Sequence, residues 1–176
     1  MLNSKSGTEA VPSQSTAISL LKFPFKLTKD QIEAIDAWIT NGYRGSIIYN
    51  TGTDKTEIAF ECAKRAAETR DDNLFNILFV VPRIVLVRQN IDRLTRYGIP
   101  EERIGAYFGE RKEVREITIS TYQSVISNLD LINNSNMIIF DEVHLVSETA
   151  TTLRKVFDFV TAADPKAITR PNCNNR

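Results

Sequence analysis

Long apolar runs are missing from this sequence, and their absence excludes a membrane-spanning helix, which needs about 18 or more consecutive apolar residues. The first twenty residues contain Ser, Thr, Gln and Glu where a secretory signal would need an apolar segment. The only cysteines, Cys62 and Cys173, form no CxxC pair, and two distant thiols cannot build a zinc site alone. These absences predict a cytoplasmic protein in a reduced compartment, with no membrane partner.

An excess of charge of one sign is also missing, because 22 basic side chains balance 22 acidic ones. The chain as a whole is therefore not attracted to phosphate, and any binding of nucleic acid must come from a local cluster of Lys and Arg. With 176 residues and 42% hydrophobic residues, the chain is long and apolar enough for one globular domain with a tail.

The composition changes near both ends of the chain. Residues 1–22 are rich in Ser and Thr and show no helical or strand period, so they predict a flexible leader, with order beginning near Phe23. Residues 164–176 also lack a period and predict an irregular tail. The folded domain is therefore expected to span residues 23–163.

Short apolar segments alternate with helical patterns through this domain. The expected strands are residues 46–49, 77–81, 104–108, 117–120 and 137–140. Helices are expected after Thr28, after Lys55, around residues 86–97, near 122–131 and near 151–160. The strands are continuously apolar, which implies burial on both faces. This pattern predicts an α/β fold with a mainly parallel, doubly wound sheet in three layers.

The first helix has clear start and stop signals. Thr28 and Gln31 have the spacing of a capping box, and Asn41-Gly42 is a typical helix end. Its apolar side chains should form one buried face, made of Ile32, Ile35, Trp38 and Ile39.

The loop after the first expected strand could bind phosphate. It reads Asn50-Thr51-Gly52-Thr53-Asp54-Lys55-Thr56 and leads into a helix. A phosphate-binding loop wraps backbone N–H groups round the phosphates, places a Lys on the β and γ phosphates, and places a hydroxyl on Mg²⁺. Lys55 and Thr56 meet the last two needs, but Asp54 stands where the general pattern has Gly. An ordinary strand-to-helix turn with a Lys at the helix start is the alternative.

A second candidate site follows the last expected strand, in the sequence Asp141-Glu142-Val143-His144. Ligands bind at the carboxyl edge of a doubly wound sheet, where Asp141 could hold Mg²⁺ through water and Glu142 could orient or deprotonate an attacking water. The alternative is a solvated pair of loop acids, with His144 as an ordinary surface or capping imidazole.

Together, the two sites resemble those of the first RecA-like domain of superfamily 2 helicases in the DEXH-box group, a P-loop NTPase fold. Further segments match in order: residues 27–31 resemble the Q motif, residues 81–89 resemble motif Ia, and residues 119–123 resemble motif Ib or Ic. The resemblance covers residues 23–160 and is closest to the branch of the xeroderma pigmentosum group B type and restriction-enzyme helicases.

The resemblance implies ATP and Mg²⁺ as cofactors. It implies that Gln31 reads the adenine, a role that can coexist with its capping box. It also implies that Lys55, Thr56 and Asp141 bind phosphate and Mg²⁺, that Glu142 is the catalytic base, and that His144 couples the nucleotide state to a partner domain. Arg83 and Thr121 would contact the backbone of one nucleic-acid strand, with DNA favoured; for Arg83 a solvated charge at the helix start is the alternative.

Two departures from the family pattern bear on the function. Asp54 puts a negative charge beside the phosphates, which should weaken nucleotide binding. Motif III and the second RecA-like domain, expected to follow residues 166–171, are missing, and the end resembles that of a fragment or an interrupted reading frame. The prediction is the N-terminal motor half of a DEXH-box DNA helicase or translocase. It is expected to bind ATP with Mg²⁺ and nucleic acid, and to be inactive or very weak in ATP hydrolysis without a second RecA-like domain or subunit. The alternative is a degenerate, non-hydrolysing module that binds nucleic acid or a motor partner; a small P-loop kinase is a more distant one.

Overall fold

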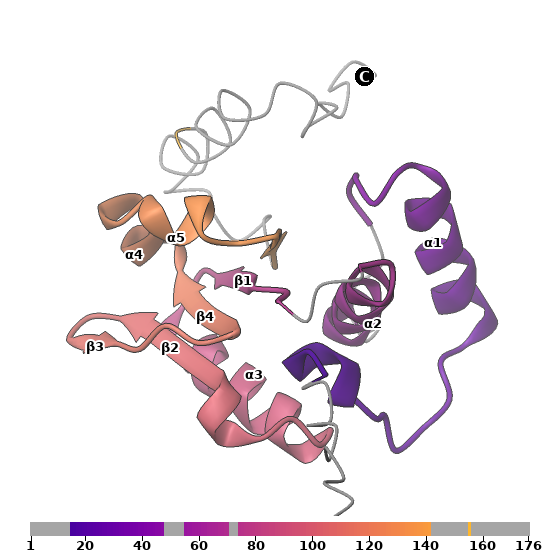
Figure 1. Cartoon of the computed structure of the whole chain (residues 1–176), viewed down its shortest axis with the longest axis horizontal. Coiled ribbons are helices and arrows are strands. Elements are labelled where there is room, and N and C mark those ends of the chain that lie inside the picture. Colours follow the sequence, from indigo (N-terminus) through magenta and orange to yellow (C-terminus); the bar gives the residue numbers. More distant parts are fainter. Residues whose placement is uncertain (1–14, 48–54, 71–73, 142–154, 156–176) are drawn as a thin grey trace, which may run out of the picture.

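A five-stranded sheet forms the centre of the molecule (Figure 1). The computed structural model describes residues 15–47, 55–70, 74–141 and 155. The strands are β1 (Ile77–Val81), β2 (Ile104–Phe108), β3 (Arg111–Lys112), β4 (Ile117–Thr121) and β5 (Met137–Phe140). Their order across the sheet is β3-β2-β4-β1-β5.

The sheet is parallel except at one edge. Strand β1 pairs in parallel with β4 on one side and with β5 on the other, so that Phe79 lies opposite both Ile119 and Ile139. Strand β2 adds to β4 in parallel. The expected mainly parallel sheet is therefore confirmed. Of the strand expected at residues 46–49, Ser46 and Ile47 lie outside regular structure and residues 48–49 lie outside the described residues, so that strand stays a prediction.

Strand β3 was not predicted, and it is the antiparallel member of the sheet. Its two residues, Arg111 and Lys112, are charged and exposed, so they show no apolar pattern that could have indicated a strand. The chain after β3 crosses closely over Gly105 of β2: a Cβ at that position would lie 2.5 Å from the carbonyl oxygen of Glu113. A glycine is therefore needed there for backbone approach, and its φ is not in the left-handed region.

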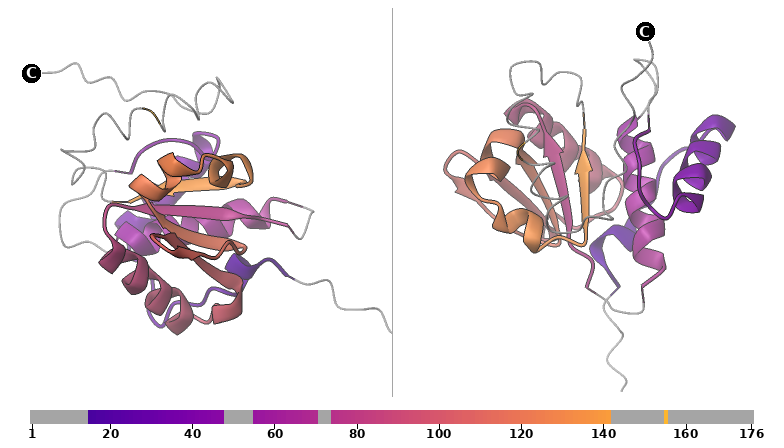
Figure 2. Two further views of the ribbon diagram at one scale, coloured as in Figure 1. Left: turned by 90° about the vertical axis from the view of Figure 1, so that its left-hand side faces the viewer. Right: turned by 90° about the horizontal axis from the view of Figure 1, so that it is seen from above.

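Helices cover both faces of the sheet (Figure 2). Helices α2 (Lys55–Glu68) and α3 (Ile84–Arg96) pack on the face to which Ile77, Phe79 and Val81 point. The short helices α4 (Tyr122–Ser127) and α5 (Asp130–Asn133) pack on the other face, against Leu78 and Val80. Because consecutive residues of a strand point to opposite faces, this arrangement requires the continuous apolar pattern of β1. The three layers are those expected from the sequence.

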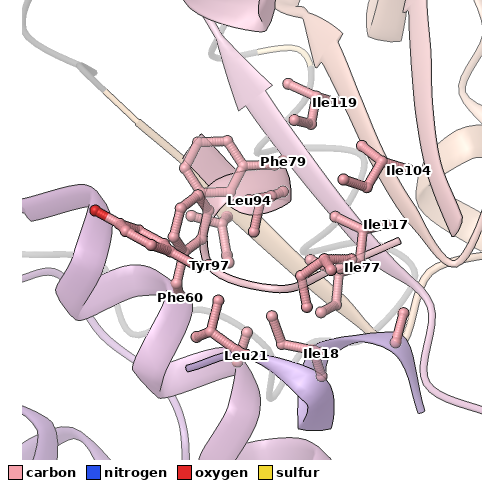
Figure 3. Packing of buried hydrophobic residues seen from close by; sticks show 14 of the residues in the cluster. Ile18, Leu21, Phe60, Ile77, Phe79, Leu94, Tyr97, Ile104, Ile117 and Ile119 are labelled. Carbon is pink, nitrogen blue, oxygen red and sulfur yellow. The ribbon is translucent and has the colours of Figure 1, made fainter. Parts of the chain in front are cut away.

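The folded core begins earlier than predicted. A 3-10 helix, η1 (Ala17–Leu20), precedes Phe23, and both Ile18 and Leu21 are buried in the main core near Phe60 and Ile77 (Figure 3). The prediction of a flexible leader up to residue 22 is therefore wrong over its last residues. The segment is too short to show a helical period, and its apolar side chains are buried only by contact with the sheet and α2.

Ion pairing also holds this first segment in place. The guanidinium of Arg103 contacts the carboxylate of Glu116 at 2.6 Å, and both groups are partly buried. The same carboxylate accepts a hydrogen bond from the backbone N–H of Ala17 at 2.9 Å, and Arg103 donates to the carbonyl of Ser15 at 2.8 Å. Residues 15–17 are thus attached to the chain that enters β2 and β4.

Helix α1 (Lys29–Thr40) begins and ends as predicted. The hydroxyl of Thr28 accepts a hydrogen bond from the N–H of Gln31, and the side chain of Gln31 accepts one from the N–H of Thr28, so the capping box is present. The prediction of one buried apolar face is only partly correct, because Ile35 is buried against α2 whereas Ile32 is 46% exposed. Helix α1 rests on α2 rather than on the sheet, so the surface that it buries is narrow.

The helix expected near residues 122–131 is interrupted. It forms α4 and α5, separated at Asn128, whose extended backbone (φ −147°, ψ 88°) ends α4. The helix expected at 151–160 lies outside the described residues, apart from the helical Lys155. The tail expected at 164–176 also lies outside them. No described helix combines the length and apolar character that a membrane crossing requires.

Replacement of Gly105 should reveal the close approach over β2. We expect Gly105→Ala to lower the free energy of unfolding by about 1–3 kcal/mol, because a new methyl group would displace the backbone at Glu113. Urea unfolding measures the change. Gly109→Ala is the comparison, since its Cβ would meet no atom within 4 Å and would cost only its left-handed backbone (φ 49°). A smaller loss for Gly105→Ala than for Gly109→Ala would contradict this account.

Candidate functional site

The carboxyl ends of three neighbouring strands meet at one edge of the sheet. Because β4, β1 and β5 are parallel and in register, the residues that follow them lie near each other. These residues are Arg83 after β1, Tyr122 after β4 and Asp141 after β5. The loop that leads to Lys55 was expected to follow a strand of the same mainly parallel sheet, so Lys55 and Asp141 are expected at this one edge.

Two hydrogen bonds fix the backbone of Asp141. Its N–H donates to the carbonyl of Val80 at 2.9 Å, and its own carbonyl accepts a hydrogen bond from the hydroxyl of Tyr122 at 3.0 Å. Tyr122 is 2% exposed, and its ring stacks on that of Phe140 with centroids 6.0 Å apart. The position of Asp141 is therefore set by β1 and α4 together, which leaves its carboxylate to reach towards α2.

The first turn of α2 comes to the same place. The hydroxyl oxygen of Thr56 lies 3.4 Å from a carboxylate oxygen of Asp141, although 85 positions separate the two residues in the chain. This distance exceeds the usual 2.5–3.0 Å of a hydroxyl hydrogen bond, so the two oxygens are neighbours rather than a tight pair. The prediction that the Lys55-Thr56 turn and Asp141 share one sheet edge is confirmed.

Two adjacent hard oxygens of this kind suit Mg²⁺. Neighbouring ligands of an octahedral Mg²⁺ at about 2.05 Å lie about 2.9 Å apart, so Thr56 and Asp141 need only a small approach to share one ion. Within residues 15–47, 55–70, 74–141 and 155, no three His, Cys, Asp or Glu residues gather in one place. The pair therefore fits an ion that takes its remaining oxygens from phosphate and water, as Mg²⁺ commonly does.

The same helix turn contains a buried acid that sequence reasoning missed. Glu57 is 3% exposed, and its Oε1 accepts a hydrogen bond from the hydroxyl of Tyr97 at 2.8 Å, with the Nε of Arg93 3.4 Å away. Burial raises the pKa of Tyr97 to about 12, and the bond to Glu57 adds to this shift. A Glu on the apolar side of α2 was the available signal, but its partners are 36 and 40 positions later in the chain.

The residues expected to touch nucleic acid differ in their surroundings. Arg83 is exposed at the start of α3, and its side chain makes no capping hydrogen bond. Thr121 is only 8% exposed, and its hydroxyl accepts a hydrogen bond from the N–H of Ser124 at 3.4 Å as the N-cap of α4. The structure therefore gives Thr121 a structural role, while Arg83 faces solvent at the edge where the candidate site lies.

Other predicted site residues are placed only in part. Gln31 is buried and occupied by its capping box, so its structural role is confirmed and its contact with adenine stays a prediction. Lys55 is the first residue of α2. The remaining predicted residues lie outside the described part of the chain, namely Thr51, Gly52, Thr53, Asp54, Glu142 and His144.

Comparison with known proteins agrees with this arrangement. Residues 24–166 match the family described as type III restriction enzyme, res subunit. This chain belongs to that family. The matched region includes both the Lys55-Thr56 turn and Asp141.

The chain is also similar to two bacterial proteins that are named DNA 3'-5' helicase XPB. The chain is 33% identical to that of Kineococcus radiotolerans and 32% identical to that of Mycobacterium tuberculosis, each over 146 residues. Each match covers 77% of this chain and 25% of the relative. The chain thus spans about a quarter of the length of these relatives.

Solved structures show the same fold. The UvsW helicase from bacteriophage T4 matches with a TM-score of 0.66 and 17% identity, over 80% of this chain and 51% of that one. A nuclease-deletion mutant of the type ISP restriction-modification enzyme LlaGI, in complex with a DNA substrate mimic, matches with a TM-score of 0.59 and 18% identity. That match covers 77% of this chain and 16% of the other. The α/β fold predicted from the sequence is therefore shared with these two solved structures.

Removal of the Tyr122 hydroxyl should loosen the strand end that places Asp141. We expect Tyr122→Phe to lower the free energy of unfolding by about 1 kcal/mol, because the carbonyl of Asp141 loses a donor while the ring stack on Phe140 remains. Urea unfolding measures this loss. Tyr43→Phe is the control, since Tyr43 is exposed and packs edge-on against Trp38. Equal losses in the two variants would argue against a role for the Tyr122 hydrogen bond.

Proposed function

We propose that this domain is the N-terminal motor half of a DEXH-box DNA helicase or translocase, which binds ATP with Mg²⁺ and contacts nucleic acid. The observation that carries the proposal is the proximity of Thr56 to Asp141 across the sheet edge. The fold brings this hydroxyl and this carboxylate, 85 positions apart in the chain, to within 3.4 Å of one another at the start of a helix, and such a pair of oxygens suits Mg²⁺. Membership of the family supports the same conclusion.

Each residue of the site would then have a defined task. The first-turn N–H groups of α2 would bind the phosphates, and Lys55 would place its ammonium on the β and γ phosphates. Thr56 and Asp141 would hold the Mg²⁺, which supplies charge neutralisation at the phosphates. Glu142 would orient and deprotonate the attacking water.

Further residues would link the nucleotide to the rest of the protein. Gln31 would contact the adenine edge with the hydrogen-bonding capacity that its capping box leaves, and His144 would pass the nucleotide state to a partner domain. Residues 51–54 would complete the loop round the phosphates.

Nucleic acid would lie along the carboxyl edge of the sheet. Arg83 is exposed there, as the residue that precedes α3, and would contact one phosphate of a single strand. The contact would be independent of base sequence, and it would weaken as salt concentration rises. Thr121 would contribute through the position of its backbone, since its hydroxyl already caps α4. DNA is favoured because two relatives are named as DNA helicases.

A degenerate, non-hydrolysing module that binds nucleic acid or a motor partner is the second candidate function. Asp54 is the observation that favours it, because a carboxylate directly before Lys55 would repel bound phosphates. Titration of a fluorescent ATP analogue in the presence of Mg²⁺ separates the two candidates. Saturable, Mg²⁺-dependent binding supports the motor, and its absence in both the parent and an Asp54→Gly variant supports the module.

Replacement of Asp54 should strengthen nucleotide binding. We expect Asp54→Gly to tighten the binding of Mg-ATP by about 1–3 kcal/mol, because it removes a partly desolvated like charge and a side chain near the phosphates. Isothermal titration calorimetry measures the change. Lys55→Ala in the Asp54→Gly background is the control and should abolish the gain. Equal affinity of the parent and the Gly variant would rule out repulsion by Asp54.

Hydrolysis by this chain alone should be slow. An arginine finger from a second RecA-like domain or subunit typically contributes about 10³ to 10⁵ in rate, and we propose that the site needs such a partner. Phosphate release with single-stranded DNA present should therefore stay far below helicase rates, even for Asp54→Gly. Glu142→Gln is the control for contaminating activity. Rapid turnover that disappears in Glu142→Gln would show that the chain already has a complete active site.

A further inference from the structure

Glu57 joins two helices that the proposed function uses separately. It belongs to the first turn of α2, directly after Thr56, and its partners Arg93 and Tyr97 lie at the end of α3. The contact therefore connects the turn expected to bind nucleotide to the helix whose first residues are expected to face nucleic acid.

The end of α3 is firmly held where Glu57 meets it. The backbone carbonyl of Tyr97 accepts a hydrogen bond from the N–H of Lys22 at 2.8 Å, and its ring packs edge-on against Phe23 with centroids 5.1 Å apart. Leu94, one turn earlier, is fully buried in the main core, where Figure 3 shows it beside Phe79. The hydroxyl of Tyr97 thus has little freedom to follow Glu57 by itself, so a shift of α2 has to move α3 or break this bond.

Glu57 also needs a partner for electrostatic reasons. A buried carboxylate one residue after Thr56 would repel bound phosphates unless its charge were compensated. Arg93 provides the compensation from a side chain that is 32% exposed, and Tyr97 provides a neutral donor. The arrangement lets α2 keep an acid beneath the phosphate site only while α3 stays in place.

The ion pair has room to tighten. An Arg–carboxylate pair is strongest when two N–H groups donate to two oxygens at about 2.7–2.9 Å. Here a single Nε lies 3.4 Å from Oε1, and within the described part of the chain Oε2 of Glu57 has no hydrogen-bond partner. A rotation of the first turn of α2 that brought Oε2 to Arg93 would give the pair its second hydrogen bond.

We infer that Glu57 is a positioning residue that couples nucleotide binding at α2 to the placement of α3, and through α3 to the nucleic-acid contact at Arg83. The inference rests on the proposed function. Helix α3 has 13 residues and a length of about 20 Å, so a small change of its tilt about the anchored end at Tyr97 would displace its first turn. By linkage, nucleotide and nucleic acid then alter each other's affinity by the same factor.

The test measures this factor directly. The full chain is used in the Asp54→Gly background, and its affinity for a fluorescein-labelled oligothymidine is measured by anisotropy with and without a saturating non-hydrolysable ATP analogue and Mg²⁺. We expect the analogue to change the affinity for the oligonucleotide by about tenfold, within the usual range of coupling. In Glu57→Gln, which keeps the shape of the side chain, the factor by which the analogue changes the oligonucleotide affinity should fall to about one. The affinity for each ligand measured alone should change less than this factor does.

Two further variants separate coupling from a general structural effect. Tyr97→Phe removes the 2.8 Å bond and should reduce the factor in the same direction. Glu61→Gln is the matched control, because Glu61 is a buried acid one turn later on α2 whose Arg partner, Arg65, lies on the same helix at 2.8 Å. It should leave the factor unchanged. An unchanged factor in both Glu57→Gln and Tyr97→Phe, or an equal loss in Glu61→Gln, would overturn the inference.

The remaining outcomes separate this inference from the proposed function. If the Asp54→Gly chain fails to bind the ATP analogue, the oligonucleotide or both, the proposed function is rejected, and the inference with it. Binding of both ligands without mutual influence overturns the inference alone. Binding of both ligands with a factor that depends on Glu57 supports both.

A spectroscopic readout tests the contact without any ligand. Ultraviolet titration of the parent, with Tyr97→Phe to assign the signal, should show Tyr97 ionising near its raised pKa of about 12 rather than the ordinary value of 10. In Glu57→Gln the pKa of Tyr97 should move towards 10, because the anionic acceptor is lost. A titration of Tyr97 that does not change in Glu57→Gln would show that the hydroxyl is not bound to Glu57, and this would also overturn the inference.

Discussion

The parallel pairing of β1 with both β4 and β5 is the constraint on which the rest of the structure depends. Three strands that run in the same direction and in register must end at the same edge, and the residues after them must then lie together. Asp141 is one of these residues, and its backbone is held by Val80 and Tyr122. The site is therefore a consequence of strand direction rather than of any contact between neighbours in the sequence.

Burial of β1 on both faces explains why helices must flank the sheet. Its five residues are all apolar and all buried, so neither face can meet water. Helices α2 and α3 cover one face, and α2 can begin beside Asp141 because it packs over the sheet from that edge. Helix α2 therefore has two roles: it packs Phe60 against Phe79 in the core, and it places Thr56 at the candidate site.

Two acidic side chains of the fold, one buried and one partly buried, are each paired with an arginine. Glu57 is buried beneath the candidate site and is compensated by Arg93, whereas Glu116 is compensated by Arg103 at the opposite edge of the sheet. The second pair attaches residues 15–17, and the first connects α2 with α3. A buried acid without such a partner would cost several kcal/mol. The two pairs therefore act as specific contacts between segments that the apolar core alone would hold less selectively.

Local patterns in the sequence determined the capping box of α1, the bounds of β1, β2 and β5, and the motif order that indicated a helicase-type domain. These features depend on neighbouring residues or on strand periodicity, so a single sequence contains them. Tertiary structure alone decided the burial of Ile18 and Leu21 and the partners of Glu57. Each of these depends on residues far apart in the chain, whose proximity is set by the sheet and leaves no periodic signal in the sequence.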